Sequence, residues 1–138
     1  MQNMNSFKNV HFVFISKDGV TSPKFDFLEY ISIRSFMLNN EDYTCHLHVT
    51  KKALPVGIYF DKIKSEYDIN IHELEHMDMF MGNPIPYFTH KTDIIRLLAL
   101  LKYGGIYLDL DTITDSKIIL DQYLGDNDLY AVEEDDNC

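Results

Sequence analysis

The fold of this chain is decided by one continuous stretch. Residues 92–111 read TDIIRLLALLKYGGIYLDLD. Strong helix formers fill its first half, and Thr89, just before it, can cap a helix. Two glycines follow Tyr103, and glycine commonly ends helices. We therefore predict a helix over 89–103. Its apolar stripe at helical spacing contains Ile94, Leu97, Leu98 and Leu101.

The six residues after the glycines alternate between apolar and polar side chains. This pattern predicts a strand over 106–111, with Asp109 and Asp111 on one face at its end. Two adjacent carboxylates repel each other, and a divalent cation removes the conflict, since oxygen ligands suit Mg²⁺ or Mn²⁺. The alternative is that the two acids only begin a polar turn into residues 112–115.

The rest of the chain alternates between strands and helices. Apolar runs predict strands over 10–15, 45–50, 69–71 and 129–133, helical spacing predicts helices over 26–38 and 59–67, and two prolines predict a loop over 82–86. This order is typical of an α/β protein with a layered sheet and parallel neighbouring strands.

Length and composition are those of a single domain covering residues 1–138. The chain is 46% hydrophobic, enough for a packed core, and has no apolar run of the roughly 20 residues that cross a bilayer. A polar amino terminus and only two cysteines lead us to expect a cytoplasmic protein without a disulfide framework. The net charge is −10, with an acidic run over 121–138, so nucleic acid is a poor partner.

Residues 92–111 resemble the DXD signature block of the sugar-binding glycosyltransferases of family 32 and of the large clostridial glucosylating toxins. The shared pattern is a hydroxyl residue, Asp, two apolar residues, Arg, an apolar helix, and Gly-Gly-x-Tyr-x-Asp-x-Asp. The first strand of those families resembles residues 10–14, VHFVF. The resemblance implies an α/β, GT-A (Rossmann-like) fold of nucleotide-diphospho-sugar transferases, incomplete on the C-terminal acceptor side.

The resemblance also implies catalytic roles for Asp109, Asp111 and Arg96. Asp111 would bind the metal directly, and Asp109 would contact the metal and the ribose. Asp93 would accept hydrogen bonds from sugar hydroxyls. Arg96 would hold the sugar or the diphosphate, whose geometry a planar guanidinium matches. The alternative for Asp93 and Arg96 is a surface ion pair at i,i+3 spacing.

Four further residues complete the donor site that the resemblance implies. Tyr107 would reach the phosphate side, and Val13 and Phe14 would pack on the base. Thr92 stands where the family has Ser, which keeps the hydroxyl. Phe14 stands where the toxins have Trp, so stacking is kept and the indole donor is lost. The alternative for Tyr107 and Phe14 is aromatic packing in the core.

The activity implied by the resemblance is a metal-dependent, retaining sugar transfer. The donor would be a nucleoside-diphosphate sugar carrying UDP or GDP, the cofactor Mn²⁺ or Mg²⁺, and the acceptor a glycan or another hydroxyl compound, as in polysaccharide biosynthesis. Only 27 residues follow Asp111, so a missing C-terminal segment or a partner chain would complete the acceptor site. The alternative is a nucleotide-sugar-binding module or truncated enzyme without turnover.

A second motif competes with this interpretation. Residues 72–76 read HELEH and match H-E-x-x-H, which on a helix presents two zinc ligands and a general base. A strand pattern precedes the motif, prolines follow it, and no third ligand follows at the usual spacing. A zinc hydrolase is the more distant alternative. His46 and His48 are expected to be surface or structural residues.

Overall fold

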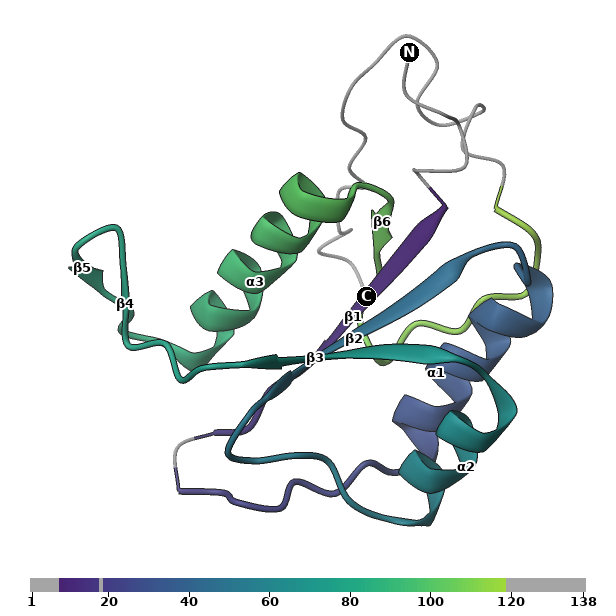
Figure 1. Ribbon diagram of the computed structural model, residues 1–138, viewed down its shortest axis with the longest axis horizontal. Helices are drawn as coiled ribbons and strands as arrows, with labels where there is room; N and C mark the ends of the chain where they lie inside the picture. Colours follow the sequence, from purple (N-terminus) through teal and green to yellow (C-terminus); the bar gives the residue numbers. More distant parts are fainter. Residues whose placement is uncertain (1–7, 18, 119–138) are drawn as a thin grey trace, which may run out of the picture.

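A parallel sheet forms the middle of the protein, and helices cover both of its faces. The computed structural model describes residues 8–17 and 19–118. The sheet has the strand order β3-β2-β1-β6 with every pair parallel, and β4 and β5 form a separate antiparallel hairpin (Figure 1). This confirms the α/β class with parallel neighbours. The elements are β1 (Asn9–Phe14), α1 (Phe27–Asn39), β2 (Thr44–Thr50), α2 (Ile58–Glu66), β3 (Ile69–Leu74), β4 (Met79–Phe80), β5 (Asn83–Pro84), α3 (Phe88–Tyr103) and β6 (Ile106–Tyr107).

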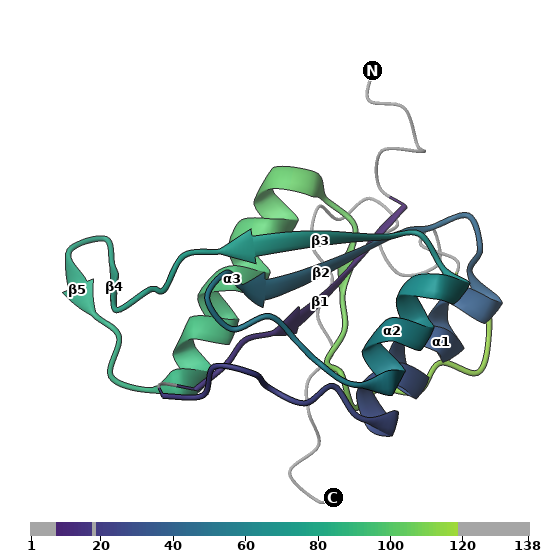
Figure 2. The same cartoon turned by 60° about the horizontal axis from the view of Figure 1, so that its bottom comes forward.

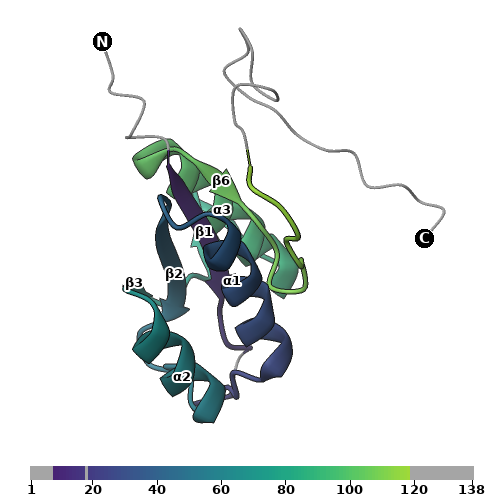
Figure 3. The same ribbon diagram turned by 90° about the vertical axis from the view of Figure 1, so that its right-hand side faces the viewer.

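The two faces of the sheet differ in chemistry. Helices α1 and α2 cover one face and α3 covers the other (Figures 2 and 3). Alternation along β1 sends Val10 and Phe12 into the apolar core beneath α1 and α2, whereas His11 lies against Tyr103 of α3. The α1 side therefore holds the main hydrophobic core, and the α3 side holds a more polar layer.

The orientation of α3 places its first turns at the carboxyl edge of the sheet. Its last residue, Tyr103, accepts a hydrogen bond from Asn9 at the beginning of β1. Its first residue, Phe88, has the ammonium group of Lys17, beyond the end of β1, 5.9 Å from its ring centroid. Ligands of open α/β sheets bind outside this edge, so α3 carries its amino-terminal residues to the expected binding region.

The helix–glycine–strand prediction is confirmed with two corrections. Thr89 does not cap the helix, because α3 begins one residue earlier and its N-cap, Tyr87, makes no side-chain cap. The strand is shorter than residues 106–111, because β6 pairs only with β1, and Thr112 N–H bonds to Asp109 C=O at 3.0 Å in a turn. The alternation of burial nevertheless continues: two leucines of this stretch pack against the core and the two acids are exposed.

Glycine is sterically required at the link between α3 and β6. Gly105 has φ of 102°, and a Cβ there would lie 2.1 Å from the carbonyl oxygen of Asn9. Gly104 ends the helix at φ 70°. Both angles lie in the region that L side chains rarely adopt. The glycine pair thus lets the chain pass directly against β1.

The sequence pattern predicts the wrong face of α3 to be buried. The residues that α3 buries are Ile95 and Ala99, whereas Leu97, Leu98 and Leu101 are 59%, 42% and 84% exposed. The physical reason is that Tyr103 of α3 lies on the histidine rings of the sheet, at centroid distances of 5.0 to 5.7 Å. Ala99 and Ile95 lie one and two turns earlier on the same side of the helix, so this side faces the sheet. Ile94 is half-buried.

Some predictions lie outside the described residues, namely the strand over 129–133, Cys138 and the acidic run over 121–138. The loop predicted over 82–86 contains the two-residue strand β5. Within residues 8–17 and 19–118, no helix is long and apolar enough to cross a membrane.

Candidate functional site

Four of the predicted site residues form one continuous chain of side-chain contacts. Arg96 donates a hydrogen bond to Asp93, one turn earlier in α3. The guanidinium carbon of Arg96 lies 4.6 Å from the ring centroid of Tyr107 in β6. The hydroxyl of Tyr107 in turn donates to Oδ1 of Asp109 at 2.9 Å. The first turns of α3 and the end of β6 therefore meet through their side chains at the carboxyl edge of the sheet.

Arg96 is held in place but is not saturated by protein acceptors. Its side chain is 36% exposed, and its Nε is buried without a hydrogen-bond partner in the described part of the chain. A guanidinium has five N–H donors in a rigid fork, and the ion pair with Asp93 uses only some of them. The cation–π contact with Tyr107 fixes the plane of the fork. The arrangement leaves donors for an anionic group.

Tyr107 acts as a hydrogen-bond donor over the whole accessible pH range. Burial raises the pKa of its phenol well above the ordinary value, and the hydrogen bond to Asp109 raises it further, whereas Arg96 lowers it. The phenol therefore stays protonated and Asp109 stays the acceptor. This bond ties the side chain of Asp109 to the ring that supports Arg96.

The two acids after β6 suit a partly solvated divalent cation. Asp109 and Asp111 are both exposed. No group of three or more His, Cys, Asp or Glu residues that could hold a metal occurs within residues 8–17 and 19–118. Mg²⁺ and Mn²⁺ are commonly held by one or two carboxylates, with waters and substrate phosphates as the other ligands. The carboxylates of Asp109 and Asp111 fit a site of that kind. They do not fit a site in which the protein supplies every ligand.

The structure does not bring Val13 and Phe14 to one surface. Val13 follows His11 on the α3 side of β1, whereas the ring of Phe14 lies on the opposite side, 5.4 Å from the ring of Phe25 in edge-to-face geometry. Phe14 therefore takes part in core packing. Thr92 is half-buried in α3, next to Asp93.

A layer of four histidines beneath α3 was not predicted as a unit. His11, His46, His48 and His72 come from three adjacent strands, and their rings stack at centroid distances of 4.7 to 5.3 Å. Tyr103 of α3 covers three of them at 5.0 to 5.7 Å. The available signal was strand alternation, which places histidines at the same register of parallel neighbours. His46 and His48 are structural, and a surface position for them is wrong.

Hydrogen bonds fix the tautomers in this layer. The carbonyl of Gly104 can only accept, so Nε2 of His11 donates to it at 2.9 Å, and Nδ1 of His11 must accept from Nε2 of His48 at 3.1 Å. Likewise, Nε2 of His46 donates to Asn9 Oδ1 at 2.9 Å and its Nδ1 accepts from His72 at 2.8 Å. Both chains of bonds are those of neutral rings, which burial favours because it lowers the pKa of each of the four histidines.

These contacts exclude the zinc-protease geometry for residues 72–76. His72 lies in β3 and bonds to His46, whereas His76 lies beyond the strand and bonds to Asp78 at 2.7 Å. Residues four apart converge on a helix, but along an extended chain they are about 13 Å apart. The H-E-x-x-H match therefore has the wrong backbone conformation.

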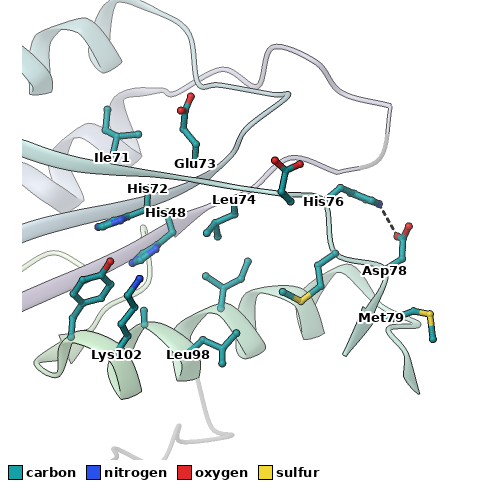
Figure 4. Close-up of a pocket in the computed structure, with 15 residues that line it drawn as sticks. His48, Ile71, His72, Glu73, Leu74, His76, Asp78, Met79, Leu98 and Lys102 are labelled. Atoms are coloured by element: carbon teal, nitrogen blue, oxygen red, sulfur yellow. Dashed lines mark hydrogen bonds and ion pairs between the residues drawn. The ribbon is translucent and has the colours of Figure 1, made fainter. Parts of the chain in front are cut away.

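A cavity of about 910 Å³ lies between α3 and the extension of β3. His48, His72 and Lys102 line its inner part (Figure 4). None of Asp93, Arg96, Tyr107 and Asp109 lines it. The cavity opens at the β3 edge of the sheet, whereas β6 is the opposite edge, so the cavity and the Arg96 site are separate.

Comparison with solved structures places the fold among the glycosyltransferases. The PaToxG glycosyltransferase is similar with a TM-score of 0.51 and 21% identity, over 80% of this chain and 44% of that chain. With the parallel sheet, this similarity identifies a GT-A-like fold.

Sequence comparison gives the family. Residues 26–130 match the family described as glycosyltransferase sugar-binding region containing DXD motif, and the chain belongs to this family. A curated relative, "Glucan organizing enzyme 1" of Cryptococcus neoformans var. grubii serotype A, is 31% identical over 105 residues, covering 74% of this chain. The chain spans 28% of the length of that relative.

Proposed function

We propose that this chain binds the donor of a metal-dependent glycosyltransferase that transfers a sugar, with retention, from a UDP- or GDP-sugar to a glycan or another hydroxyl acceptor. The observation that carries the proposal is the contact chain from Asp93 through Arg96 and Tyr107 to Asp109. It aligns a carboxylate, a cation and a second carboxylate at the edge where such ligands bind.

Each residue of this chain has a chemical role in the proposal. Asp93 accepts hydrogen bonds from sugar hydroxyls, and Arg96 pairs with the diphosphate, where charge grows as the sugar leaves. Tyr107 lies on the phosphate side and orients Asp109 toward the ribose. Thr92 adds a hydroxyl beside Asp93.

A divalent ion, Mn²⁺ or Mg²⁺, would be held by Asp109 and Asp111. When bound, it would supply positive charge that stabilises the leaving diphosphate. The protein's own contribution is to hold both carboxylates exposed on the segment that follows β6. Val13 is proposed to lie beside the base. Phe14 would need to leave its contact with Phe25 to do the same.

The acceptor is proposed to be a glycan. The name of the relative "Glucan organizing enzyme 1" supports a role in polysaccharide biosynthesis. A second candidate function is nucleotide-sugar binding without turnover. The chain spans 28% and 44% of the lengths of the two proteins it matches, so turnover by the whole protein is itself part of the proposal. Additional chain or a partner would then supply the acceptor site.

Thermal-shift screening of UDP- and GDP-sugars, each with and without Mn²⁺, tests the proposal. We expect one donor to stabilise the wild type only when Mn²⁺ is present. In Asp109→Asn/Asp111→Asn we expect this Mn²⁺-dependent stabilisation to be lost. Asp115→Asn changes an exposed acid in the same segment and is the matched control. Equal nucleotide binding with and without metal would reject the metal site. Hydrolysis of the donor then separates an enzyme from a binding module.

A further inference from the structure

The segment that carries the two acids is attached to α1 by side chains of that helix. After β6 the chain crosses to the α1 side and runs along the helix (Figures 1 and 3). Three polar residues of α1 and its C-cap residue face this segment, and we call them the polar row: Ser32, Ser35, Asn39 and the C-cap Asn40. Three of the four, Ser32, Ser35 and Asn40, are buried.

The contacts begin at the acids themselves. The hydroxyl of Ser32 is completely buried and shares its proton between the carbonyl of Thr112, at 2.8 Å, and that of Asp109, at 3.3 Å. These carbonyls lie on either side of Asp111. Ser32 therefore holds the backbone of the turn that contains both carboxylates.

The rest of the row continues the attachment at every second residue. Ser35 accepts from the N–H of Thr114 at 3.0 Å, and Asn39 donates to the carbonyl of the same residue at 3.1 Å. Asn40 accepts from the N–H of Ile118 at 2.7 Å. Alternate backbone groups of an extended segment point to one side, so the row substitutes for a neighbouring strand.

A general stabilising role alone does not explain the choice of residues. Ser32 and Ser35 lie inside α1, where serine is a poorer helix former than alanine, and buried polar side chains cost free energy unless they are bonded. Here every member of the row bonds to backbone of residues 109–118. Three of them also donate to carbonyls of α1: Ser35 to Ser32 at 3.1 Å, Asn39 to Ser35 at 2.8 Å, and Asn40 to Phe36 at 3.0 Å.

We infer that the polar row positions Asp109 and Asp111 for the metal–diphosphate group, with Ser32 as the principal positioning residue; this rests on the proposed function. β6 pairs with β1 over two residues, and Leu108 and Leu110 pack against the core. Ser32 then fixes the backbone of the turn in which the two acids lie. Removing the Ser32 hydroxyl leaves the carbonyl of Thr112 without this donor, whereas the carbonyl of Asp109 keeps its bond from the Thr112 N–H, and the turn loses its attachment to α1 at this point. The carboxylates then no longer hold their mutual spacing.

Titration calorimetry of the whole chain with UDP, with and without Mn²⁺, tests this inference. For Ser32→Ala we expect Mn²⁺-dependent affinity to fall about tenfold, as one unsatisfied buried group costs, and metal-free UDP affinity to stay unchanged. Ser65→Ala, at an exposed serine of α2 that donates to Lys62 C=O, is the control. Asn39→Ala, at a half-buried position, is the milder variant should Ser32→Ala fail to fold, with a smaller fall in the same quantity.

Hydrogen exchange, together with the binding data, distinguishes failure of this inference from failure of the proposed function. We expect faster exchange of the Thr114 amide in Ser35→Ala than in the wild type. If the wild type binds Mn²⁺–UDP and the folded variants bind it equally well, the inference is rejected while the proposed function stands. If the wild type binds no nucleotide in a metal-dependent way, the proposed function is rejected and the inference falls with it, even where exchange confirms the attachment.

Discussion

Arg96 stacks on Tyr107, with its guanidinium carbon 4.6 Å from the ring centroid, and so joins a helix residue to a strand residue eleven positions later. The ring sets the plane of the guanidinium, and its hydroxyl sets the position of Asp109. One aromatic side chain thereby orients both a cation and a carboxylate. This is the relationship on which the proposed donor site depends.

Tyr107→Phe should separate these two effects. The phenylalanine ring keeps the contact with Arg96, whereas Asp109 loses its hydrogen-bond donor. We expect donor affinity to fall about threefold to tenfold, the usual effect of one hydrogen bond. Tyr107→Ala, which also removes the stack, should cost more. Tyr59→Phe, in α2 on the opposite side of the sheet, is the calorimetric control, and an equal loss in both Phe variants would contradict the role of the hydroxyl.

Asp93 and Arg96 should differ in what they recognise. Asp93→Asn is expected to weaken a nucleotide-sugar much more than the free nucleotide, because only the sugar offers hydroxyls. Arg96→Ala should weaken both by at least about tenfold, since both contain the diphosphate. Fold stability should change by only a few tenths of a kcal/mol for either, as for an exposed i,i+3 pair. Asp68→Asn is the control, and equal losses of both ligands in Asp93→Asn would reject the sugar contact.

The histidine layer should make stability depend on pH. Burial lowers the pKa of His48 to about 3 and that of His46 to about 4, and it also lowers the pKa values of His11 and His72. Lys102 lowers that of His72 further, and Tyr103 is the other α3 side chain on the layer. The unfolded chain then binds more protons below about pH 6.5. The free energy of unfolding should fall as pH drops from about 6.5 toward 4, by at most about 1.4 kcal/mol per pH unit per histidine.

His48→Gln isolates this contribution. The glutamine amide keeps a donor for His11 but cannot be protonated, so urea unfolding should lose less stability between pH 7 and pH 5 than in the wild type. Above pH 7 the free energy of unfolding should depend on pH in the same way in both proteins. Identical slopes below pH 6.5 would mean that the layer is not neutral in the folded protein.

The free energy of unfolding of two variants tests which face of α3 packs against the sheet. Ile95→Ala should cost about 2–4 kcal/mol, because Ile95 is buried against the sheet side. Leu101→Ala should change stability by no more than about 0.5 kcal/mol, because its side chain is 84% exposed. Urea unfolding of both variants measures this difference. A larger loss of stability in Leu101→Ala than in Ile95→Ala would mean that the leucine face predicted from sequence spacing is the buried one.

The sequence by itself determined the order of strands and helices, the helix–glycine–strand link and the family. Each depends on neighbours in the chain: an apolar run at residues 10–15, helical spacing at 26–38, and a glycine pair after Tyr103. Such signals are local because backbone propensity and side-chain period act over a few residues. They also located Asp93, Arg96, Tyr107 and Asp109, since these lie within one short motif.

Only the tertiary structure decided which faces meet. The spacing of α3 was compatible with a leucine face or an Ile95 face toward the sheet, and the ring layer beneath selected the second. The polar row joins Ser32 to Thr112 across 80 positions, and His11 meets His48 across 37. Contacts of this kind depend on strand order and helix placement, because periodicity defines a face only relative to its own element and leaves open what that face will touch.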